Sequence, residues 1–442
     1  MPRAIVVGGG AAGTSAAFRL QQTGASVLLV EREARLGGRM RTEHVDGFDV
    51  DIGAGLLPGT YVALRRLMDD AGLLDRLDQL NSPIAVMRDR RMRYFDSANP
   101  IMAVARSGLL STPTLLKLSK IALKLIPMRS SLDFENLGKA AEHDRETVAE
   151  YTKRVINDEA LDYLIGPIVK TMYSMSPSEA SVLDLFWCLN NLLAADAYSI
   201  RGGMEAMPTA IAQKLSEVRL ETECVGVRET ADGVQVTLRD RKGHQSTERA
   251  DVCVLATRAR DVPSMHHALS AEARRCFEKI RFTATAEIHL MLRAPTSERA
   301  AVVMIPDAED PDIATISFVH NRGIGRVPPG KGAVSVYFHE RWAHEVRELS
   351  DDEVYVEGMK RLQRLMPEIE PLVEGRIVQR WDVVATKSHP GYWKNVDRLV
   401  KNLDLGSRIQ LAGDYFALAC VNTAVTSGEQ AAARLVAKGY VR

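Results

Sequence analysis

A glycine-rich turn near the N-terminus constrains the fold of this chain more than any other feature. An apolar run at Ala4–Val7 stops at three consecutive glycines, and a helical pattern follows through Leu20. A second apolar run, Ser26–Val30, then ends in Glu31. The order strand, glycine turn, helix and strand predicts a βαβ unit of the Rossmann type, and therefore an α/β fold built on a parallel sheet.

Each glycine of this turn has a physical role in binding a dinucleotide. Gly8 allows the tight turn, Gly10 lets the backbone approach a pyrophosphate, and Gly13 lets the helix pack closely on the strand. The first helical turn, which contains Ala12, offers free N–H groups and a positive dipole end to phosphate. Glu31 lies near the position of the acid that accepts hydrogen bonds from ribose. We therefore favour a dinucleotide site over a tight turn without a ligand.

Composition narrows the class of protein further. The chain has 442 residues with 57 basic and 57 acidic side chains, and this zero net charge argues against a nucleic-acid partner. The five cysteines are scattered without a two-residue-spaced pair, which argues against zinc and disulfides and indicates a reducing compartment. The first strand begins by residue 4, leaving no room for a signal peptide, and no apolar run could cross a bilayer. We expect a cytoplasmic protein without a metal site.

The chain is too long for one compact core, so two intimately packed domains are expected. Strand and glycine patterns assign residues 1–80, 200–280 and 395–442 to the nucleotide-binding domain. Residues 81–199 show helical periodicities with no strong strand pairs, whereas residues 281–394 contain several strand patterns. These last two segments are predicted to form a substrate-binding α+β domain with a mixed sheet and helices.

Two segments that follow Glu31 distinguish among dinucleotide-binding proteins. They read Leu36-Gly37-Gly38-Arg39 and Phe48-Asp49-Val50-Asp51-Ile52-Gly53-Ala54-Gly55, and near the C-terminus Ala412-Gly413-Asp414 precedes a predicted helix from Asn422. These motifs, in this order, resemble the flavin amine oxidase and protoporphyrinogen oxidase superfamily of FAD-dependent oxidoreductases. The resemblance covers nearly the whole chain. It implies an FAD-dependent oxidase or dehydrogenase, and non-covalent FAD is expected because no cysteine or histidine occupies a flavin-linkage position.

The resemblance also implies a set of flavin contacts. Arg39 would meet the flavin or the pyrophosphate, residues 53–56 would line the isoalloxazine ring, and Asp414 would accept from the ribitol or lie by the phosphates. The N-terminus of the last helix would face the N1–C2=O edge, where reduced flavin is anionic. The backbone of Val225, in the middle strand of a predicted meander, would meet adenine. The predicted cofactor-binding residues are Gly8, Gly10, Ala12, Gly13, Glu31, Arg32, Gly38, Arg39, Gly53, Ala54, Gly55, Leu56, Val225, Gly413, Asp414, Thr423 and Ala424.

The chain departs from the family pattern at three positions. Many amine oxidases carry a lysine near flavin N5 on a substrate-domain strand, and Glu287 takes that position here. We expect Glu287 to point to solvent from an edge strand. Of the two aromatic rings that sandwich an amine, Tyr392 supplies one, but Cys420 stands at the other. The arginine usually found two residues after the ribose acid is Glu33, although Arg32 precedes it.

Four residues are candidates for contact with the substrate: Tyr173, Tyr392, Cys420 and Asn422. Each also has a structural alternative. The two tyrosines could be core residues with satisfied hydroxyls, the cysteine a small buried hydrophobe, and the asparagine a helix N-cap. A flavin takes hydride from a carbon held near N5, so the protein supplies orientation and dryness and needs no dedicated acid–base pair.

These observations predict removal of a hydride from a C–N bond or an activated C–C bond of a largely apolar small molecule. The missing lysine and incomplete aromatic cage favour a protoporphyrinogen-oxidase-like or desaturase-like reaction, with oxygen or another carrier as acceptor. A redox-neutral FAD-dependent double-bond isomerase is the alternative. A non-catalytic flavin-binding protein is a third class, which the intact flavin motifs disfavour.

A basic segment lies within the predicted substrate domain. Residues 97–132 contain no acid, and Arg106, Lys117, Lys120, Lys124 and Arg129 alternate there with leucine and isoleucine. Basic amphipathic stretches bind anionic interfaces, so residues 106–129 are a candidate for peripheral membrane contact. A cap helix over the cavity, with its lysines in water, is the favoured alternative. The sequence gives no oligomeric state.

Overall fold

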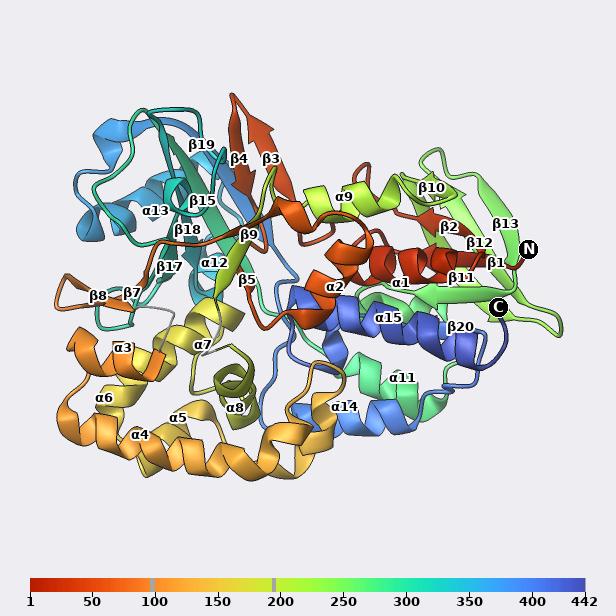
Figure 1. Ribbon diagram of the computed structural model, residues 1–442, viewed down its shortest axis with the longest axis horizontal. Coiled ribbons are helices and arrows are strands. Elements are labelled where there is room, and N and C mark those ends of the chain that lie inside the picture. The colour runs from red at the N-terminus through yellow and green to blue at the C-terminus, as the bar shows by residue number, and fades with distance from the viewer. Residues whose placement is uncertain (96–99, 193–195, 442) are drawn as a thin grey trace.

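The computed structural model describes residues 1–95, 100–192 and 196–441, and it is built on two large sheets (Figure 1). The first sheet is parallel, with the strand order β10-β2-β1-β14-β20. Its strands are β1 (Arg3–Val7), β2 (Ser26–Val30), β10 (Glu217–Arg219), β14 (Val252–Leu255) and β20 (Ile409–Leu411). The predicted Rossmann-type α/β fold is confirmed by this sheet and its helices.

Two helices from opposite ends of the chain lie side by side against the parallel sheet (Figure 1). They are α1 (Ala11–Gln22) and α15 (Val421–Ala437). A Cβ atom on Gly428 of α15 would overlap the carbonyl oxygen of Ala12 in α1, so a glycine is needed for this close approach. The packing brings the N-terminal glycine turn and the C-terminal motif to one end of the sheet, where the site lies.

A three-stranded antiparallel sheet adjoins the parallel sheet, in the order β11-β12-β13. Its strands are β11 (Thr222–Glu229), β12 (Val234–Asp240) and β13 (Gln245–Ala250). Val225 lies on the edge strand β11 rather than on a middle strand, at a register shift between Cys224 and Gly226. The meander starts one strand later than the sequence pattern indicated, because β10 pairs with β2 of the parallel sheet instead.

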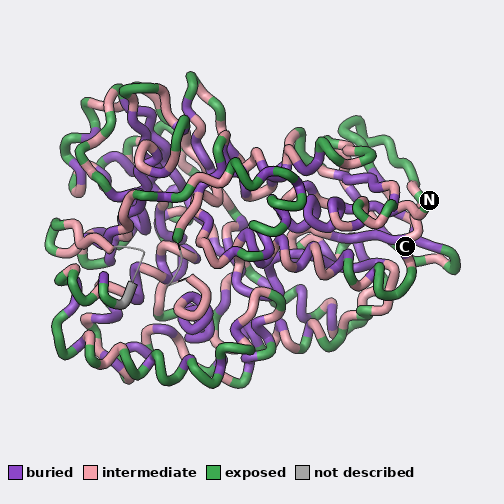
Figure 2. The backbone as a smooth tube through the Cα atoms, viewed as in Figure 1, coloured by how far each residue is buried: buried purple, intermediate pink, exposed green. Residues whose placement is uncertain are grey.

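The second large sheet is mixed and has seven strands in the order β19-β15-β18-β17-β16-β7-β8. They are β7 (Ile84–Arg88), β8 (Arg91–Phe95), β15 (Thr285–Leu292), β16 (Val302–Met304), β17 (Ile313–Phe318), β18 (Gly332–Phe338) and β19 (Val373–Trp381). Five of these strands were expected within residues 281–394. Figure 2 shows buried residues running through both large sheets.

The hairpin β7–β8 contradicts the expectation of no strand pairs in residues 81–199. Its turn residues Asp89 and Arg90 both have positive φ, at 54° and 57°, as a type I′ turn requires. Such turns are usually marked by Asn-Gly or Asp-Gly, and the Asp-Arg pair therefore gave no hairpin signal. The remainder of this segment is mainly helical, as predicted, but Ala197–Ile200 forms the short strand β9.

The position of β15 also corrects an expectation. This strand pairs with β18 on one side and β19 on the other, so it is an interior strand and not an edge. All eight of its residues are buried. Glu287 therefore cannot point to solvent, because both faces of the strand are covered.

Helices cover the two sheets and close the space between them. Those of the helical segment are α3 (Pro100–Ser107), α4 (Thr112–Leu125), α5 (Val148–Val155), α6 (Asp158–Ala160), α7 (Gly166–Tyr173) and α8 (Val182–Asn191). The others are α2 (Val62–Asp70), α9 (Ala206–Ala212), α10 (Val262–Met265), α11 (Ala271–Glu278), α12 (Glu340–Glu345), α13 (Asp351–Leu365) and α14 (Tyr392–Lys401). Small strands β3 (Thr42–Val45), β4 (Phe48–Asp51), β5 (Leu57–Pro58) and β6 (Leu77–Gln79) complete the described strands. Within the described ranges, no helix is long and apolar enough to cross a membrane.

A buried acid joins α8 to α14 and makes stability depend on pH. Asp184 accepts hydrogen bonds from Ser388 and from Trp393 Nε1 at 2.8 Å, and its side chain is fully buried. Burial raises the pKa of Asp184 to about 8, with a smaller contribution from the charge of Asp144, and the two hydrogen bonds oppose the shift. Because the folded state holds this proton more tightly, the stabilisation is complete below the unfolded pKa of 3.8 and is lost as pH rises through about 8.

The free energy of unfolding is therefore expected to decrease between pH 4 and 8, by up to about 1.4 kcal/mol per pH unit from this group. Asp184→Asn should flatten that slope. Urea unfolding at a series of pH values, with saturating FAD, measures it. Glu348→Gln serves as the control, because Glu348 is 92% exposed and should keep the wild-type slope. An unchanged slope in Asp184→Asn would contradict the assignment.

Candidate active site

A cavity of about 670 Å³ lies between the parallel sheet and the seven-stranded sheet. It collects motifs that are far apart in the sequence. Fifteen predicted residues line it: Gly8, Gly10, Ala12, Glu31, Arg32, Gly38, Arg39, Gly53, Ala54, Gly55, Leu56, Gly413, Asp414, Cys420 and Ala424. Six predicted residues do not: Gly13, Val225, Thr423, Tyr173, Tyr392 and Asn422.

The turn after β1 forms a cradle of backbone groups at the N-terminus of α1. Gly8 has a φ of 108°, which favours glycine, and a Cβ on Gly13 would overlap the carbonyl oxygen of Gly8. Gly10 differs, because a Cβ there would have only one neighbour within 4 Å, the oxygen of Gly37 at 3.9 Å. The first turn of α1 has no side-chain cap and no acidic residue. Free N–H groups and an open glycine fit a pyrophosphate.

Glu31 forms the part of the cavity wall next to the glycine turn. Its carboxylate accepts hydrogen bonds from the backbone N–H of Gly9 at 2.6 Å and of Glu33 at 2.9 Å. The side chain is thereby held at the end of β2, where it lines the cavity. Val225 is set back from this wall, and its neighbours Thr222, Glu223 and Cys224 line the cavity in its place.

Residues 53–56 run along the cavity as a narrow strip. A Cβ on Gly53 would overlap the carbonyl oxygen of Arg39, and the N–H of Ala54 donates to that oxygen at 2.9 Å. The Arg39 guanidinium pairs with Asp414 at 2.8 Å, which ties the N-terminal and C-terminal motifs together. Trp381, at the end of β19, donates from Nε1 to the carbonyl oxygen of Ile52 at 2.5 Å. The strip is therefore held on both sides with its backbone beside the cavity.

The N-terminus of α15 reaches the cavity through Cys420. This residue is the N-cap of the helix, because its Sγ accepts from the N–H of Thr423 at 3.4 Å. Asn422, suggested as an N-cap, instead accepts from the N–H of Leu64 at 2.9 Å and is 2% exposed. Val421 and Ala424 face the cavity, whereas Thr423 does not. The end of this helix lies beside the cavity, and the side chains that line it differ from those predicted.

Tyr173 and Tyr392 lie in the core and do not reach the cavity. The Tyr173 hydroxyl is 2.5 Å from Cys188 Sγ, and the Tyr392 hydroxyl donates to the carbonyl oxygen of Tyr415 at 3.4 Å. Other rings line the cavity, namely Tyr61, Tyr337 and Trp381. Alternation along the predicted strands could have indicated that Tyr337 and Trp381 share a sheet face. The cross-strand register that brings that face to the cavity is not visible in the sequence.

The C-terminal end of β14 supplies a further wall that sequence reasoning missed. Ala256, Thr257 and Arg258 line the cavity directly after this strand. The sequence could have indicated this wall, because Val252–Leu255 was predicted as a central strand and these residues follow it directly. The carboxyl ends of neighbouring parallel strands meet at one sheet edge, where α/β proteins bind ligands.

Four neighbouring strands of the seven-stranded sheet each place one polar side chain toward the cavity, and these side chains form a row. In the strand register, Thr315 on β17 is paired with Tyr337 on β18, Tyr337 with Glu287 on β15, and Glu287 with Gln379 on β19. All four residues line the cavity, and we refer to them as the polar row. Directly opposed residues of antiparallel strands share a face, so the row is a consequence of register.

Three buried charges lie beside the polar row. Arg322 and Arg326 both contact the carboxylate of Asp51, and the three side chains are at most 2% exposed. Arg322 also lines the cavity, where a Cβ on Gly55 would lie 2.7 Å from its Nη2. Two guanidinium groups share one carboxylate, so this wall carries an excess positive charge.

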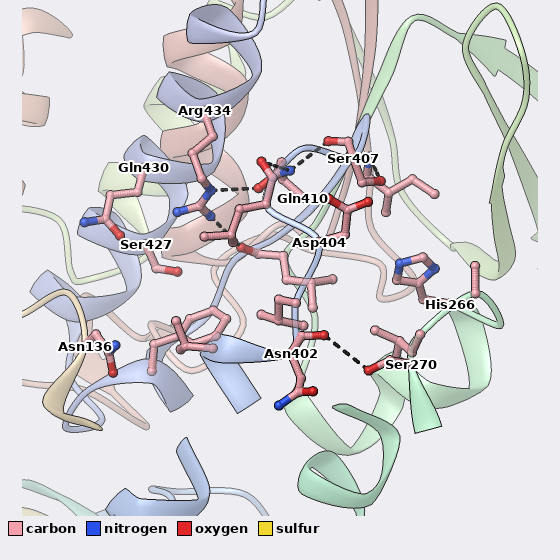
Figure 3. Close-up of a pocket in the computed structure, with 18 of the residues that line it drawn as sticks. Asn136, His266, Ser270, Asn402, Asp404, Ser407, Gln410, Ser427, Gln430 and Arg434 are labelled. Atoms are coloured by element: carbon pink, nitrogen blue, oxygen red, sulfur yellow. Dashed lines mark hydrogen bonds between the residues drawn. The ribbon is translucent and has the colours of Figure 1, made fainter. Parts of the chain in front are cut away.

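A second cavity, of about 700 Å³, lies among β20, α14 and α15 (Figure 3). Arg434 donates from Nε to Gln410 Oε1 at 2.7 Å, and Ser270 donates to the carbonyl oxygen of Asn402 at 3.2 Å. This cavity contains none of the predicted site residues and shares no lining residue with the first. The glycine cradle, the strip and the polar row all belong to the first cavity, which is therefore the candidate active site.

Comparisons with known proteins agree with this geometry. The profile of a family described as flavin containing amine oxidoreductase matches residues 11–436. Protoporphyrinogen oxidase 2 of Arabidopsis thaliana is 26% identical over 265 residues, covering 51% of this chain and 50% of that protein. The (S)-6-hydroxynicotine oxidase of Paenarthrobacter nicotinovorans is 30% identical over 264 residues, covering 55% and 58%. The match thus spans little more than half the length of these relatives.

Solved structures show the same fold. A double mutant of putrescine oxidase has a TM-score of 0.78 at 17% sequence identity, and 99% of each chain is covered. Cyclohexylamine oxidase from Brevibacterium oxydans IH-35A has a TM-score of 0.75 at 18% identity, again with 99% of each chain covered. Since the family profile spans nearly the whole chain and its motifs converge on one cavity, the chain belongs to the flavin containing amine oxidoreductase family and takes FAD as its cofactor.

Proposed function

We propose that this protein removes a hydride from a C–N bond or an activated C–C bond of a small molecule that is largely apolar. The observation that supports the proposal is one cavity lined both by the flavin motifs and by the seven-stranded sheet. The names of its relatives include oxidases of amines and of protoporphyrinogen, which are compounds of these two kinds.

FAD, when bound, supplies the hydride acceptor. The N–H groups at the start of α1 would hold the pyrophosphate, Glu31 would hold the ribose, and the N-terminus of α15 would face the ring system. The strip from Gly53 and the ring of Trp381 shape the space where a substrate is held. Most of the chain's contribution is thus positioning and exclusion of water.

The absorption spectrum before and after acid precipitation tests the cofactor part of the proposal. We expect yellow flavin in the supernatant, which indicates non-covalent FAD. Anaerobic mixing with a panel of amines and of cyclic or polyunsaturated compounds should then bleach the flavin with one class. Flavin retained in the pellet, or no bleaching by either class, would count against the proposal. We also propose an acceptor other than oxygen, and rapid reoxidation of the reduced enzyme by air would contradict that part.

A redox-neutral double-bond isomerase is the second candidate. The observation that favours it is the buried carboxyl group of Glu287 in the cavity wall, where burial raises its pKa well above its usual range and so favours the protonated form. A neutral acid beside a substrate can protonate a double bond. Conversion of a polyunsaturated compound with no electron acceptor, and without net flavin reduction, would identify this activity.

We further propose that α4 contacts an anionic membrane surface. Leu116, Leu123 and Ile126 are 72%, 69% and 63% exposed, and Lys120 and Lys124 are exposed beside them. Ile121 and Leu125 point the other way and are buried in the core. A cap helix would turn its large apolar residues inward, whereas Leu116 and Leu123 of α4, and Ile126 directly after it, are exposed. The helix α4 itself runs along one edge of the molecule (Figure 1).

The protein is expected to sediment with vesicles of phosphatidylcholine and phosphatidylglycerol, and less so at high salt. The triple variant Leu116→Ser, Leu123→Ser, Ile126→Ser should reduce partitioning by about 100-fold, because its apolar contacts are lost. The control is Val62→Ser with Ile324→Ser, since those residues are 66% and 76% exposed elsewhere. Equal loss in the control, or no wild-type sedimentation, would exclude a membrane role for α4.

A further inference from the structure

The polar row has a buried carboxyl group at its centre. Glu287 is 3% exposed and lies between Tyr337 and Gln379 in the register. The next pair on the same face of β15 and β19 is Thr285 with Trp381, two residues along, and the Trp381 ring would lie 3.6 Å from a Cβ on Gly53. Glu287 is therefore separated from the strip at Gly53 by one same-face pair.

Glu287 has no cationic partner among the described residues. Its one hydrogen bond joins Oε2 to His289 Nε2 at 3.2 Å, and His289 Nδ1 contacts Ser335 Oγ at 2.8 Å. Burial lowers the pKa of His289 to about 3, so the imidazole is neutral at physiological pH. Burial raises the pKa of Glu287 well above its usual range, which favours the neutral carboxyl group in this site without a cationic partner. This pair is a hydrogen bond between neutral groups and not an ion pair.

Two other members of the polar row, Thr315 and Gln379, have hydrogen-bond partners. Thr315 donates to Thr171 at 2.7 Å, and Gln379 donates from Nε2 to the carbonyl oxygen of Arg380 at 2.7 Å. When the Nε2–H of His289 donates to Oε2 of Glu287, the carboxyl O–H lies on Oε1. Tyr337 and Gln379 are the cross-strand partners of Glu287, and both line the cavity with it. The free O–H of Glu287 is then available to a molecule in the cavity.

The charges of the wall decide which chemical group suits this donor. Among the described residues, Asp51 is the one acidic partner of both Arg322 and Arg326, so the wall has an excess positive charge that disfavours a cationic group. A neutral Glu287 offers no compensating negative charge. An oxygen with lone pairs is favoured instead, because it accepts from the O–H and its partial negative charge is attracted to Arg322. A protonated acid in an apolar site is an established donor to a substrate oxygen in other enzymes.

We propose that Glu287 donates its O–H to an oxygen of the substrate, and that the substrate class is therefore a compound with a carbonyl or phenolic oxygen near the bond that is oxidised. The inference rests on the proposed function, since a substrate must enter this cavity. It adds a recognition group that the flavin motifs do not supply. The rival role, an ionised Glu287 that binds cations or accepts protons, predicts opposite results in both experiments below.

The first experiment measures the protonation of Glu287 in the FAD-loaded protein. The infrared difference spectrum between wild type and Glu287→Gln at neutral pH should contain the carbonyl stretch of a neutral carboxylic acid. Carboxylate bands in that difference spectrum would overturn the proposal. The flavin absorption spectrum and thermal unfolding of both proteins check that the variant is folded and loaded.

The second experiment measures binding of 4-nitrophenolate, a probe with a negatively charged oxygen, to the same loaded proteins by calorimetry. Glu287→Met should weaken binding by about 10- to 100-fold, because a hydrogen bond to a charged group is lost. Glu287→Gln should keep most of the affinity, since its amide also donates. Glu298→Met is the matched control, as Glu298 contacts the Tyr94 hydroxyl at 3.1 Å outside the cavity.

Tighter binding in both Glu287 variants would show that an ionised carboxylate had repelled the probe, and would overturn the proposal. Unchanged affinity, or no measurable binding to wild type, would overturn it too. Neither experiment involves turnover. A failure of every compound in the substrate panel would therefore count against the proposed function alone, while these results would decide the role of Glu287.

Discussion

Asp51→Asn is expected to lower the free energy of unfolding by about 3–5 kcal/mol, as removal of one partner from a buried ionic cluster does. Asp51 is the shared partner of Arg322 and Arg326, and it also accepts from the N–H of Met204 at 2.9 Å and from Thr42 Oγ1 at 2.8 Å. Without its charge, two buried guanidinium groups would face each other with no counter-ion. Chemical unfolding in saturating FAD measures the change.

Asp49→Asn is the matched control for this prediction. Asp49 lies on the same strand, β4, and its partner His44 at 2.6 Å is 60% exposed. Exposed ion pairs contribute little, so the control should change stability by less than about 1 kcal/mol. An equally small effect of Asp51→Asn would contradict the prediction, because it would show that groups other than Asp51 compensate the charges of Arg322 and Arg326.

Gly10→Val is expected to leave the protein folded and to weaken FAD binding by on the order of 100-fold, or about 2.7 kcal/mol. The φ of Gly10 is −83°, which other residues adopt, and a Cβ there would meet no protein atom closer than 3.9 Å. The added side chain would instead occupy the space through which the pyrophosphate approaches the backbone. Titration of the apoprotein with FAD, followed by quenching of flavin fluorescence, gives the affinity.

A glycine at the other end of α1 provides the control. Gly24 has a φ of 86° and no neighbour that a Cβ would meet, so Gly24→Ala strains only the backbone. It should cost about 1–2 kcal/mol of stability and leave FAD affinity unchanged. Similar FAD affinities in Gly10→Val and wild type would show that the pyrophosphate does not pass over this turn.

The sequence predicted those parts of the site that consist of short contiguous motifs. Gly8, Gly10 and Glu31 lie within one βαβ unit, and the strip at Gly53 follows within a few tens of residues. Local backbone requirements fix such motifs, because a tight turn, a close approach and a helix end each demand particular residues. Asp414, at the other end of the chain, was found because it belongs to an equally compact signature.

The residues that were misjudged depend on pairing between distant strands. Tyr173 and Tyr392 are plausible cavity residues in sequence, yet both hydroxyls are used within the core. Glu287 was expected at an exposed edge, but β18 and β19 enclose its strand on both sides. The β7–β8 hairpin was missed because its turn lacks glycine and its sheet partners lie some two hundred residues later.

By itself, the sequence determined the Rossmann-type fold, because a few glycines and one acid encode the local backbone geometry of its dinucleotide turn. The FAD cofactor and the family were indicated by the resemblance of further short motifs, such as residues 36–39 and 412–414, to those of flavin amine oxidases. The tertiary structure decided which side chains face the substrate. A one-residue change of register reverses every side chain of a strand, and the sequence does not specify the register between strands so far apart. The polar row, with Glu287 at its centre, exists only through that register.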